Sequence, residues 1–306
     1  PKPQTPNPKP QTPGPCSSKF KFKLKIMKSQ KEVFIRARPT DQFANKNIEV
    51  DSEANTISVF IPKKTEDGII NHQQDNWNFR FDKIFMNDTQ EHIFEFTGKR
   101  AVSSLIVGYS SSLLTYGQTG AGKTFTISGY DNDYRFRGIL PRAISQVFHE
   151  IKAKNDSVYT VKLNFIEIYN ETINDLLQPE SKETFLLQED SVYGVIARGS
   201  SIVEVKTEEE ALELMFQAET NRTVREHVLN RVSSRSHAIF TIILESRSKF
   251  ESKEKVTISK LNIIDLAGSE RSKKTMSKGV TLAEASFINK SLSYLEQLIV
   301  AYTEMK

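Results

Sequence analysis

The stretch Gly117-Gln118-Thr119-Gly120-Ala121-Gly122-Lys123-Thr124 decides the fold, because it fits the pattern G-x-x-x-x-G-K-[ST]. Glycines in this pattern let consecutive backbone N–H groups turn inward on an anion, and a following helix adds its positive N-terminal end. Lys123 would reach the β- and γ-phosphates of a nucleotide, and Thr124 would offer its hydroxyl to Mg²⁺. An apolar run at 113–116 precedes the motif and reads as a strand. The segment is therefore predicted to hold phosphates between a strand and a helix.

A second motif is the apolar run LNIID at 261–265, which ends in an acid and continues as LAGSE at 266–270. Open α/β sheets bind ligands at the carboxyl ends of their strands, so Asp265 is placed to hold Mg²⁺ through water. Gly268 could turn its N–H toward the γ-phosphate. Many strands end in a capping aspartate, so Asp265 alone says little. Beside the phosphate loop it indicates a nucleotide site.

A third motif is NRVSSRSH at 230–237. Hydroxyl groups beside an arginine suit a loop that senses a γ-phosphate and its metal. They suit equally well a polar loop that caps a strand. The residues by themselves leave both interpretations open.

Composition narrows the class of protein. The 306 residues carry a net charge of +4, but residues 1–31 hold eight lysines and no acidic residue or arginine. The remainder therefore carries −4, which does not support a nucleic-acid-binding body. No stretch approaches the ~20 apolar residues that a membrane span needs. The single cysteine excludes a disulfide scaffold and favours a reducing, cytoplasmic setting.

The pattern along the chain predicts a tail at 1–28, Pro-rich and then Lys-rich, followed by a folded domain at 29–306. Strands alternating with helices favour an α/β fold with helices on both faces of a sheet. The expected strands lie at 33–35, 56–61, 78–81, 113–116, 158–168, 238–244 and 258–264. The expected helices lie at 89–107, 141–153, 208–224 and 282–302.

Taken together, YGQTGAGKT, NRVSSRSH and IIDLAGSER resemble the motor domain of the kinesin superfamily. Further matches in family order are RARP at 36–39, EIYNE at 167–171, DLL at 175–177 and INKSLSYLEQ at 288–297. The segments NHQQDNW, REHVLN and SYLEQLIVA resemble the kinesin-nine branch, which is linked to cilia and flagella. The resemblance implies a kinesin-type P-loop NTPase with a central, mostly parallel mixed sheet and helices on both faces.

The resemblance also implies a Mg-ATP site, with residues 117–124 on the phosphates. Adenine would be flanked by Arg36, Arg38 and Pro39 and packed by Phe125, although the two arginines alone read as a basic strand end. The Mg²⁺ ion would be held by Thr124, Ser234 and Asp265. The residues implied to close over the γ-phosphate are Ser233 and Ser234 of a first switch, Gly268 of a second switch that begins at Asp265, and the pair Arg235 and Glu270. Arg235 and Glu270 would form a salt bridge that helps the attacking water lose its proton.

A microtubule is the partner that the resemblance implies, in the cytoplasm and cytoskeleton, with the ciliary axoneme as a candidate location. The contact would come from Lys273, Lys274 and Lys278 after the second switch and from Lys290 on the long helix. Tubulin is acidic, so these lysines would steer association. Without the resemblance, the same residues read as a solvated loop.

Kinesin motor domains continue after the long helix with a further helix, a strand, a last helix and the neck linker, so this sheet is expected to be incomplete at its C-terminal end. The leading hypothesis is a microtubule-dependent, ATP-hydrolysing motor. The alternative is a non-motile microtubule-binding protein that holds nucleotide structurally. A GTPase switch is disfavoured, because Asn45-Lys46 and Asn289-Lys290 are not followed by the aspartate of N-K-x-D.

Overall fold

The computed structural model describes residues 31–62, 74–130, 133–181, 183–228, 235–250, 255–270 and 280–304, so the predicted tail lies outside it. Its strands are β1 (Phe34–Ala37), β2 (Ile48–Asp51), β3 (Thr56–Phe60), β4 (Asn76–Arg80), β5 (Lys83–Met86), β6 (Ser111–Thr115), β7 (Ser157–Tyr169), β8 (Thr172–Asp175), β9 (Leu186–Asp190), β10 (Gly194–Arg198), β11 (Val203–Val205), β12 (His237–Ser248) and β13 (Val256–Asp265). Its helices are α1 (Gln90–Phe96), α2 (Gly98–Val107), α3 (Lys123–Ile127), α4 (Ile139–Ala153), α5 (Glu208–Val228) and α6 (Val280–Glu304).

The central sheet has the strand order β11-β7-β12-β13-β6, with β8 also paired to β7. Its mixed character confirms the expectation, but the expectation of a mostly parallel sheet is wrong for the described strands. The β13–β6 pair is parallel, whereas β7, β8, β11, β12 and β13 pair with one another in antiparallel fashion. Seven residues, 249–255, join β12 to β13. A connection this short makes a hairpin and cannot make a parallel crossover, which needs a dozen or more residues.

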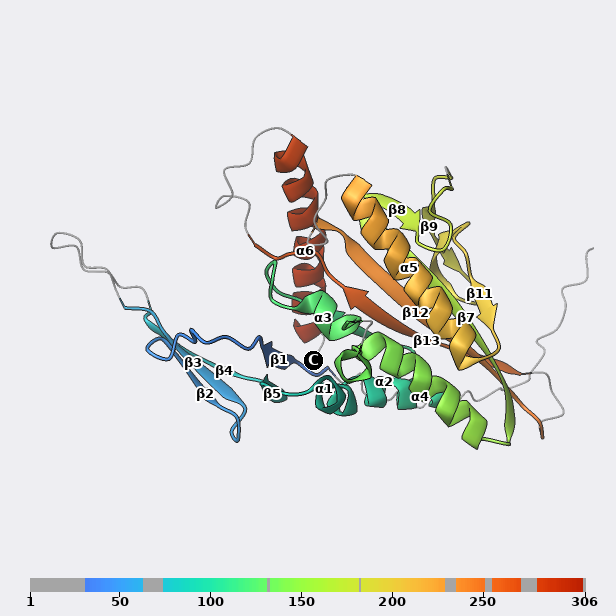
Figure 1. Cartoon of the computed structure of the whole chain (residues 1–306), viewed down its shortest axis with the longest axis horizontal. Coiled ribbons are helices and arrows are strands. Elements are labelled where there is room, and N and C mark those ends of the chain that lie inside the picture. Colours follow the sequence, from blue (N-terminus) through green and yellow to red (C-terminus); the bar gives the residue numbers. More distant parts are fainter. Residues whose placement is uncertain are drawn as a thin grey trace, which may run out of the picture.

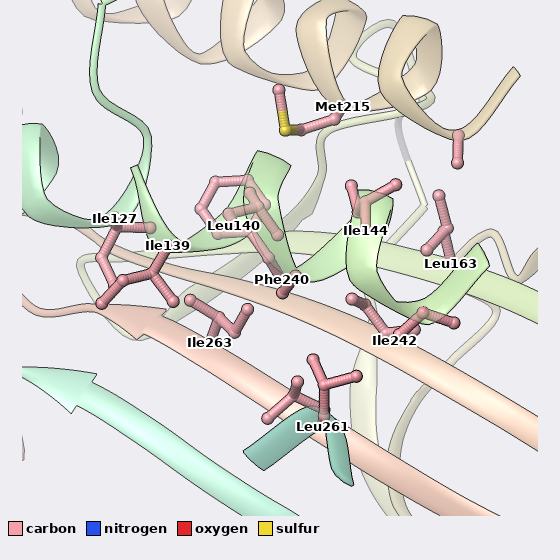
Figure 2. Close-up of a cluster of buried hydrophobic side chains, with 14 of the residues drawn as sticks. Ile127, Ile139, Leu140, Ile144, Leu163, Met215, Phe240, Ile242, Leu261 and Ile263 are labelled. Carbon is pink, nitrogen blue, oxygen red and sulfur yellow. The ribbon is translucent and has the colours of Figure 1, made fainter. Parts of the chain in front are cut away.

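Helices α2, α4 and α5 bury one face of this sheet in the main hydrophobic core (Figure 2). Strand residues alternate between faces, and the inward set on β12 and β13 includes Phe240, Ile242, Leu261 and Ile263. Met215 of α5 packs above them. Each such side chain contributes roughly 1.5–3 kcal/mol when fully buried. The loops that follow β6 and β13 therefore extend from strands that are held in a packed core.

The opposite face of the sheet has a different cover. Ile239 points to that side and packs with Ile166, Phe185 and Ala197, next to the β9–β10 hairpin. His237 points the same way and meets Ser291 of α6. Helix α6 thus lies on the face opposite α4 and α5, and helices on both faces are confirmed (Figure 1).

The N-terminal strands form two smaller sheets. β1 pairs in parallel with β5, and β2, β3 and β4 form an antiparallel meander. The meander extends away from the central sheet, at the left of Figure 1. In the part of the chain that the structure describes, no helix is long and apolar enough to cross a membrane.

The helix expected at 89–107 is two helices, α1 and α2, which meet at Thr97. The Thr97 hydroxyl donates to the Ile93 carbonyl oxygen at 2.7 Å, and Gly98 follows directly. A Cβ at Gly98 would lie 2.5 Å from the Phe94 ring, so the chain turns where a larger residue cannot fit. Apolar periodicity alone does not reveal this break.

Candidate nucleotide site

The phosphate loop joins β6 to α3, as its sequence predicts. Gly120 and Gly122 have φ angles of +81° and +93°, a left-handed conformation that glycine adopts without strain. Lys123 is the first residue of α3, a helix of five residues. The strand, loop and helix order expected around residues 117–124 is therefore confirmed.

Lys123 lies folded over its own loop. Its Nζ donates to the carbonyl oxygens of Gly117 at 3.0 Å and Gln118 at 3.2 Å. Burial lowers the pKa of the Lys123 ammonium, against the opposing effect of the Asp265 and Glu270 carboxylates. A cation held among carbonyl oxygens at the loop mouth is placed to exchange them for phosphate oxygens.

Thr124 and Asp265 are brought together by the parallel β6–β13 pair, in which Asp265 is in register with Thr115. The Thr124 hydroxyl donates to Asp265 Oδ2 at 2.7 Å. Asp265 as a whole residue is 1% exposed. A hydroxyl and a buried carboxylate are hard oxygen ligands of the kind that Mg²⁺ binds directly or through water. The two residues therefore fit the predicted metal.

Arg222 of α5 is a site residue that the sequence interpretation missed. Its Nη1 donates to Asp265 Oδ2 at 3.0 Å, and the two side chains are 5% and 2% exposed. The signal was present in the spacing, because Ala211, Met215 and Ala218 form the buried stripe of α5 and Arg222 continues it. A charged residue on a buried stripe indicates a buried partner of opposite charge.

Glu270 lies against the phosphate loop. Its carboxylate accepts hydrogen bonds from the Thr119 backbone N–H, at 2.9 Å, and from the Thr119 hydroxyl. Ser269 N–H donates to the Gly117 carbonyl oxygen at 3.1 Å. Burial raises the pKa of Glu270, but the Thr119 hydrogen bonds, the backbone N–H of Glu270 and the charge of Lys123 together outweigh it and leave the pKa below its ordinary value. The loop after β13 therefore packs directly on the cradle.

Gly268 lies within this contact. A Cβ at Gly268 would lie 2.4 Å from the Glu270 carboxylate and 2.6 Å from Thr119 Oγ1. A side chain at this position would push the Glu270 carboxylate and the Thr119 hydroxyl apart, so glycine leaves room for their contact.

The first switch is described from Arg235 onward, and the candidates Ser233 and Ser234 lie outside the described residues. Glu270 contacts Thr119 in this structure, so the expected Arg235–Glu270 salt bridge stays a prediction for the nucleotide-loaded site.

The base end of the site is a cavity of about 470 Å³ beside the phosphate loop. Its lining includes Arg38, Pro39 and Phe125, as expected, together with Tyr130, which the sequence interpretation missed. The Phe125 and Tyr130 ring centroids are 5.0 Å apart. An aromatic pair of this kind offers a π-face on which a base can stack.

Arg36 lies behind the cavity wall. Its Nη1 donates to Gln90 Oε1 at 2.9 Å and to Thr126 Oγ1 at 2.7 Å, and its guanidinium lies 5.0 Å from the Phe125 ring centroid. Burial lowers the pKa of Arg36, against the opposing charge of Asp88. Arg36 thus supports Phe125 from the strand side.

The site is linked to α6 through His237. The Ala267 N–H donates to His237 Nδ1 at 3.0 Å, so the neutral ring carries its proton on Nε2 and donates to Ser291 Oγ at 2.8 Å. Ser291 Oγ donates in turn to the Ile288 carbonyl oxygen. This chain joins the loop after Asp265 to the long helix.

Of the four candidate filament lysines, Lys290 is described. Its Nζ lies 3.3 Å from Glu171 Oε2, and both side chains are about half exposed. The candidates Lys273, Lys274 and Lys278 lie outside the described residues.

Comparison with known proteins decides the family. The family model "Kinesin motor domain" matches residues 36–306. The chain belongs to the kinesin motor-domain family. A solved structure, "Structure of a fast kinesin: Implications for ATPase mechanism and interactions with microtubules", is 33% identical with a TM-score of 0.75 and covers 90% of this chain and 76% of that chain. The kinesin-type P-loop fold is confirmed.

Relatives identify the branch of the family. The chain is 43% identical over 274 residues to Kinesin-like protein KIF9 of Mus musculus, covering 88% of this chain and 35% of that protein. It is 44% identical over 278 residues to Kinesin-like protein KLP1 of Chlamydomonas reinhardtii, covering 90% and 36%. The chain thus spans about a third of the length of these curated relatives. The similarity to them supports the kinesin-nine branch, as the sequence motifs indicated.

Proposed function

We propose that this kinesin motor domain binds Mg-ATP at residues 117–124, hydrolyses it, and couples the reaction to microtubule binding and movement. The observation that carries the proposal is the Thr124–Asp265 hydrogen bond of 2.7 Å. It brings the phosphate loop and the acid of the second switch to one point, across 141 residues of sequence. A glycine-rich turn without a nucleotide role would not need that acid.

The residues divide the work of phosphoryl transfer. Loop N–H groups and Lys123 bind the phosphates, and Thr124, Ser234 and Asp265 would hold Mg²⁺, which neutralises charge on the phosphate oxygens. Gly268 lets the second switch approach the terminal phosphate. Glu270 would leave Thr119, pair with Arg235 and accept the proton of the attacking water, directly or through a second water. Positioning and electrostatics supply most of the rate enhancement in this chemistry.

Coupling to the filament would use the connection behind the site. His237 joins Ala267 to Ser291 on α6, so a movement of the second switch would be passed to α6, the helix that follows Lys273, Lys274 and Lys278 in the sequence. Lys273, Lys274, Lys278 and Lys290 would meet the acidic surface of tubulin. We further propose the cytoskeleton as the location and the ciliary axoneme as the specific site, from the kinesin-nine similarity.

Steady-state ATP turnover with and without microtubules tests the proposal. A motor domain predicts turnover that rises at least about tenfold on microtubules, and alanine at Lys273, Lys274 and Lys278 should reduce this rise more than the basal rate. Tight nucleotide binding with filament binding but no stimulated turnover would favour the non-motile alternative. An absence of nucleotide binding would contradict both.

A further inference from the structure

The Arg222–Asp265 pair is the most completely buried ion pair in the part of the chain that the structure describes. Arg222 lies near the end of α5, and Asp265 is the last residue of β13. One oxygen, Asp265 Oδ2, accepts from both Arg222 Nη1 at 3.0 Å and Thr124 Oγ1 at 2.7 Å. Arg222 therefore donates a hydrogen bond to the same carboxylate oxygen as Thr124, the candidate Mg²⁺ ligand of the phosphate loop.

A carboxylate this deeply buried needs a nearby positive charge, since its desolvation cost is large. Thr124 and Thr115 supply neutral hydroxyl groups, the second at 3.4 Å from Oδ1. Lys123 is near enough for its charge to act on Asp265, but its Nζ donates to the carbonyl oxygens of the loop. Among the described residues, Arg222 is the cation in direct contact with Asp265. With Mg²⁺ bound, the metal would supply positive charge at the same place.

We propose that Arg222 is a positioning residue that acts as the counter-ion of Asp265 while the site holds no Mg²⁺, and keeps the carboxylate turned toward Thr124. The inference rests on the proposed nucleotide function and deepens it. A contact that stabilises the metal-free site more than the loaded site must oppose Mg²⁺ binding by the same free energy. Without Arg222, the chain should therefore depend more strongly on Mg²⁺ for its stability.

Arg225 offers a matched control, because it lies on the same helix three residues further on. Its Nε lies 3.6 Å from Oε2 of the buried Glu167, a residue of β7 that is separated from Asp265 by strand β12. Replacing Arg225 removes a cation from a buried carboxylate on the same face of the fold. It should cost stability without changing the response to Mg²⁺.

The experiment compares melting temperatures of the wild type, Arg222→Gln, Arg222→Lys and Arg225→Gln chains in ADP with Mg²⁺ and in ADP with EDTA. For Arg222→Gln, we expect the loss of melting temperature relative to wild type to be at least about 4 °C greater in EDTA. Arg222→Lys keeps the positive charge but not the planar guanidinium. Its additional loss of melting temperature in EDTA should lie between those of the wild type and Arg222→Gln. Arg225→Gln should lose the same amount in both conditions.

Equal losses for Arg222→Gln in the two conditions, or a greater loss with Mg²⁺, would overturn the inference and leave Arg222 a structural residue. If Arg222→Gln does not fold in either condition, the same comparison on Arg222→Lys decides in the same way. The wild-type chain is also melted without nucleotide, and the same melting temperature in all three conditions would overturn the proposed function and this inference together. The two failures are therefore distinguishable.

Discussion

At the phosphate end of the site, Asp265 is 1% exposed and takes hydrogen bonds from Thr124 and Arg222. At the base end, Tyr130 is 66% exposed and meets Phe125 through a ring contact. Charged contacts that are shielded from water are strong and fix geometry, whereas an exposed aromatic pair tolerates a range of ligand positions. From this difference we expect contacts to the phosphates to supply most of the nucleotide affinity and all of the hydrolysis chemistry. We expect contacts to the base to add little to the affinity.

The largest effect is expected at the phosphate end, where replacing Glu270 should reduce ATP hydrolysis but leave nucleotide binding almost unchanged. Glu270→Ala removes the proposed proton acceptor, so ATP turnover should fall about 10²–10⁴-fold. The phosphate ligands remain, so ADP affinity should change less than about threefold. Single-turnover hydrolysis and a fluorescent-nucleotide titration measure the two quantities. Turnover equal to that of the wild type would rule out the catalytic assignment.

The next effect concerns binding itself. Lys123→Ala removes the cation that would meet the β- and γ-phosphates, and ADP affinity should fall about 100-fold, which corresponds to about 2.7 kcal/mol. Equilibrium dialysis with ADP and Mg²⁺ measures the loss, and circular dichroism confirms that the variant is folded. If Lys123→Ala binds ADP within threefold of the wild type, the phosphate end does not contribute more to binding than the base end.

The base end should respond more weakly. Phe125→Ala or Tyr130→Ala removes one ring of the stacking pair, and ADP affinity should fall about 2- to 10-fold. Inorganic tripolyphosphate, which has no base, provides the control and should bind both variants as it binds the wild type. If either variant loses more ADP affinity than Lys123→Ala does, the base end contributes more to binding than the phosphate end, contrary to this account.

The smallest effect tests the connection from the phosphate end to α6. Burial lowers the pKa of His237, Arg222 and Lys123 add to this, and the charges of Asp265 and Glu171 oppose it. The folded chain therefore binds this proton less readily than the unfolded chain, whose His pKa is about 6.5. Above that pH the group has no effect. Below it, protonation of the unfolded chain should reduce the unfolding free energy by at most about 1.4 kcal/mol by pH 5.5.

Urea unfolding at pH 7.5 and 5.5 measures this loss, with His237→Asn as the test variant. Asparagine keeps one donor and one acceptor but does not titrate, so the His237 part of the pH dependence should disappear. His149→Asn on the exposed side of α4 is the matched control and should retain it. If the unfolding free energy of His237→Asn depends on pH as it does in the wild type, titration of His237 is not the cause.

The phosphate loop, the strand before it and the acid at Asp265 could be predicted from the sequence because their chemistry restricts residue type and order. The strand directions could not, since an apolar run such as 238–244 has the same pattern in a parallel or an antiparallel pair. The spacing of Arg222 indicates a buried acidic partner but does not identify it, because Asp265 lies 43 residues further along the sequence.

Two other site residues show the same limit. Tyr130 becomes part of the base end because the turn after α3 folds it back onto Phe125, which residue spacing does not reveal. The resemblance implies that Arg36 flanks the adenine, but its hydrogen bonds to Gln90 and Thr126 place it behind Phe125. Sequence motifs thus predicted the arrangement of residues at the phosphate end better than the arrangement at the base end.

The most direct test is a calorimetric titration of the chain with ADP and with adenosine, both in Mg²⁺. If the phosphate end carries the binding, ADP should bind at least about 100-fold more tightly than adenosine, and Lys123→Ala should abolish most of that difference. Adenosine binding as tightly as ADP would contradict the central claim that residues 117–124 and Asp265 form the nucleotide site.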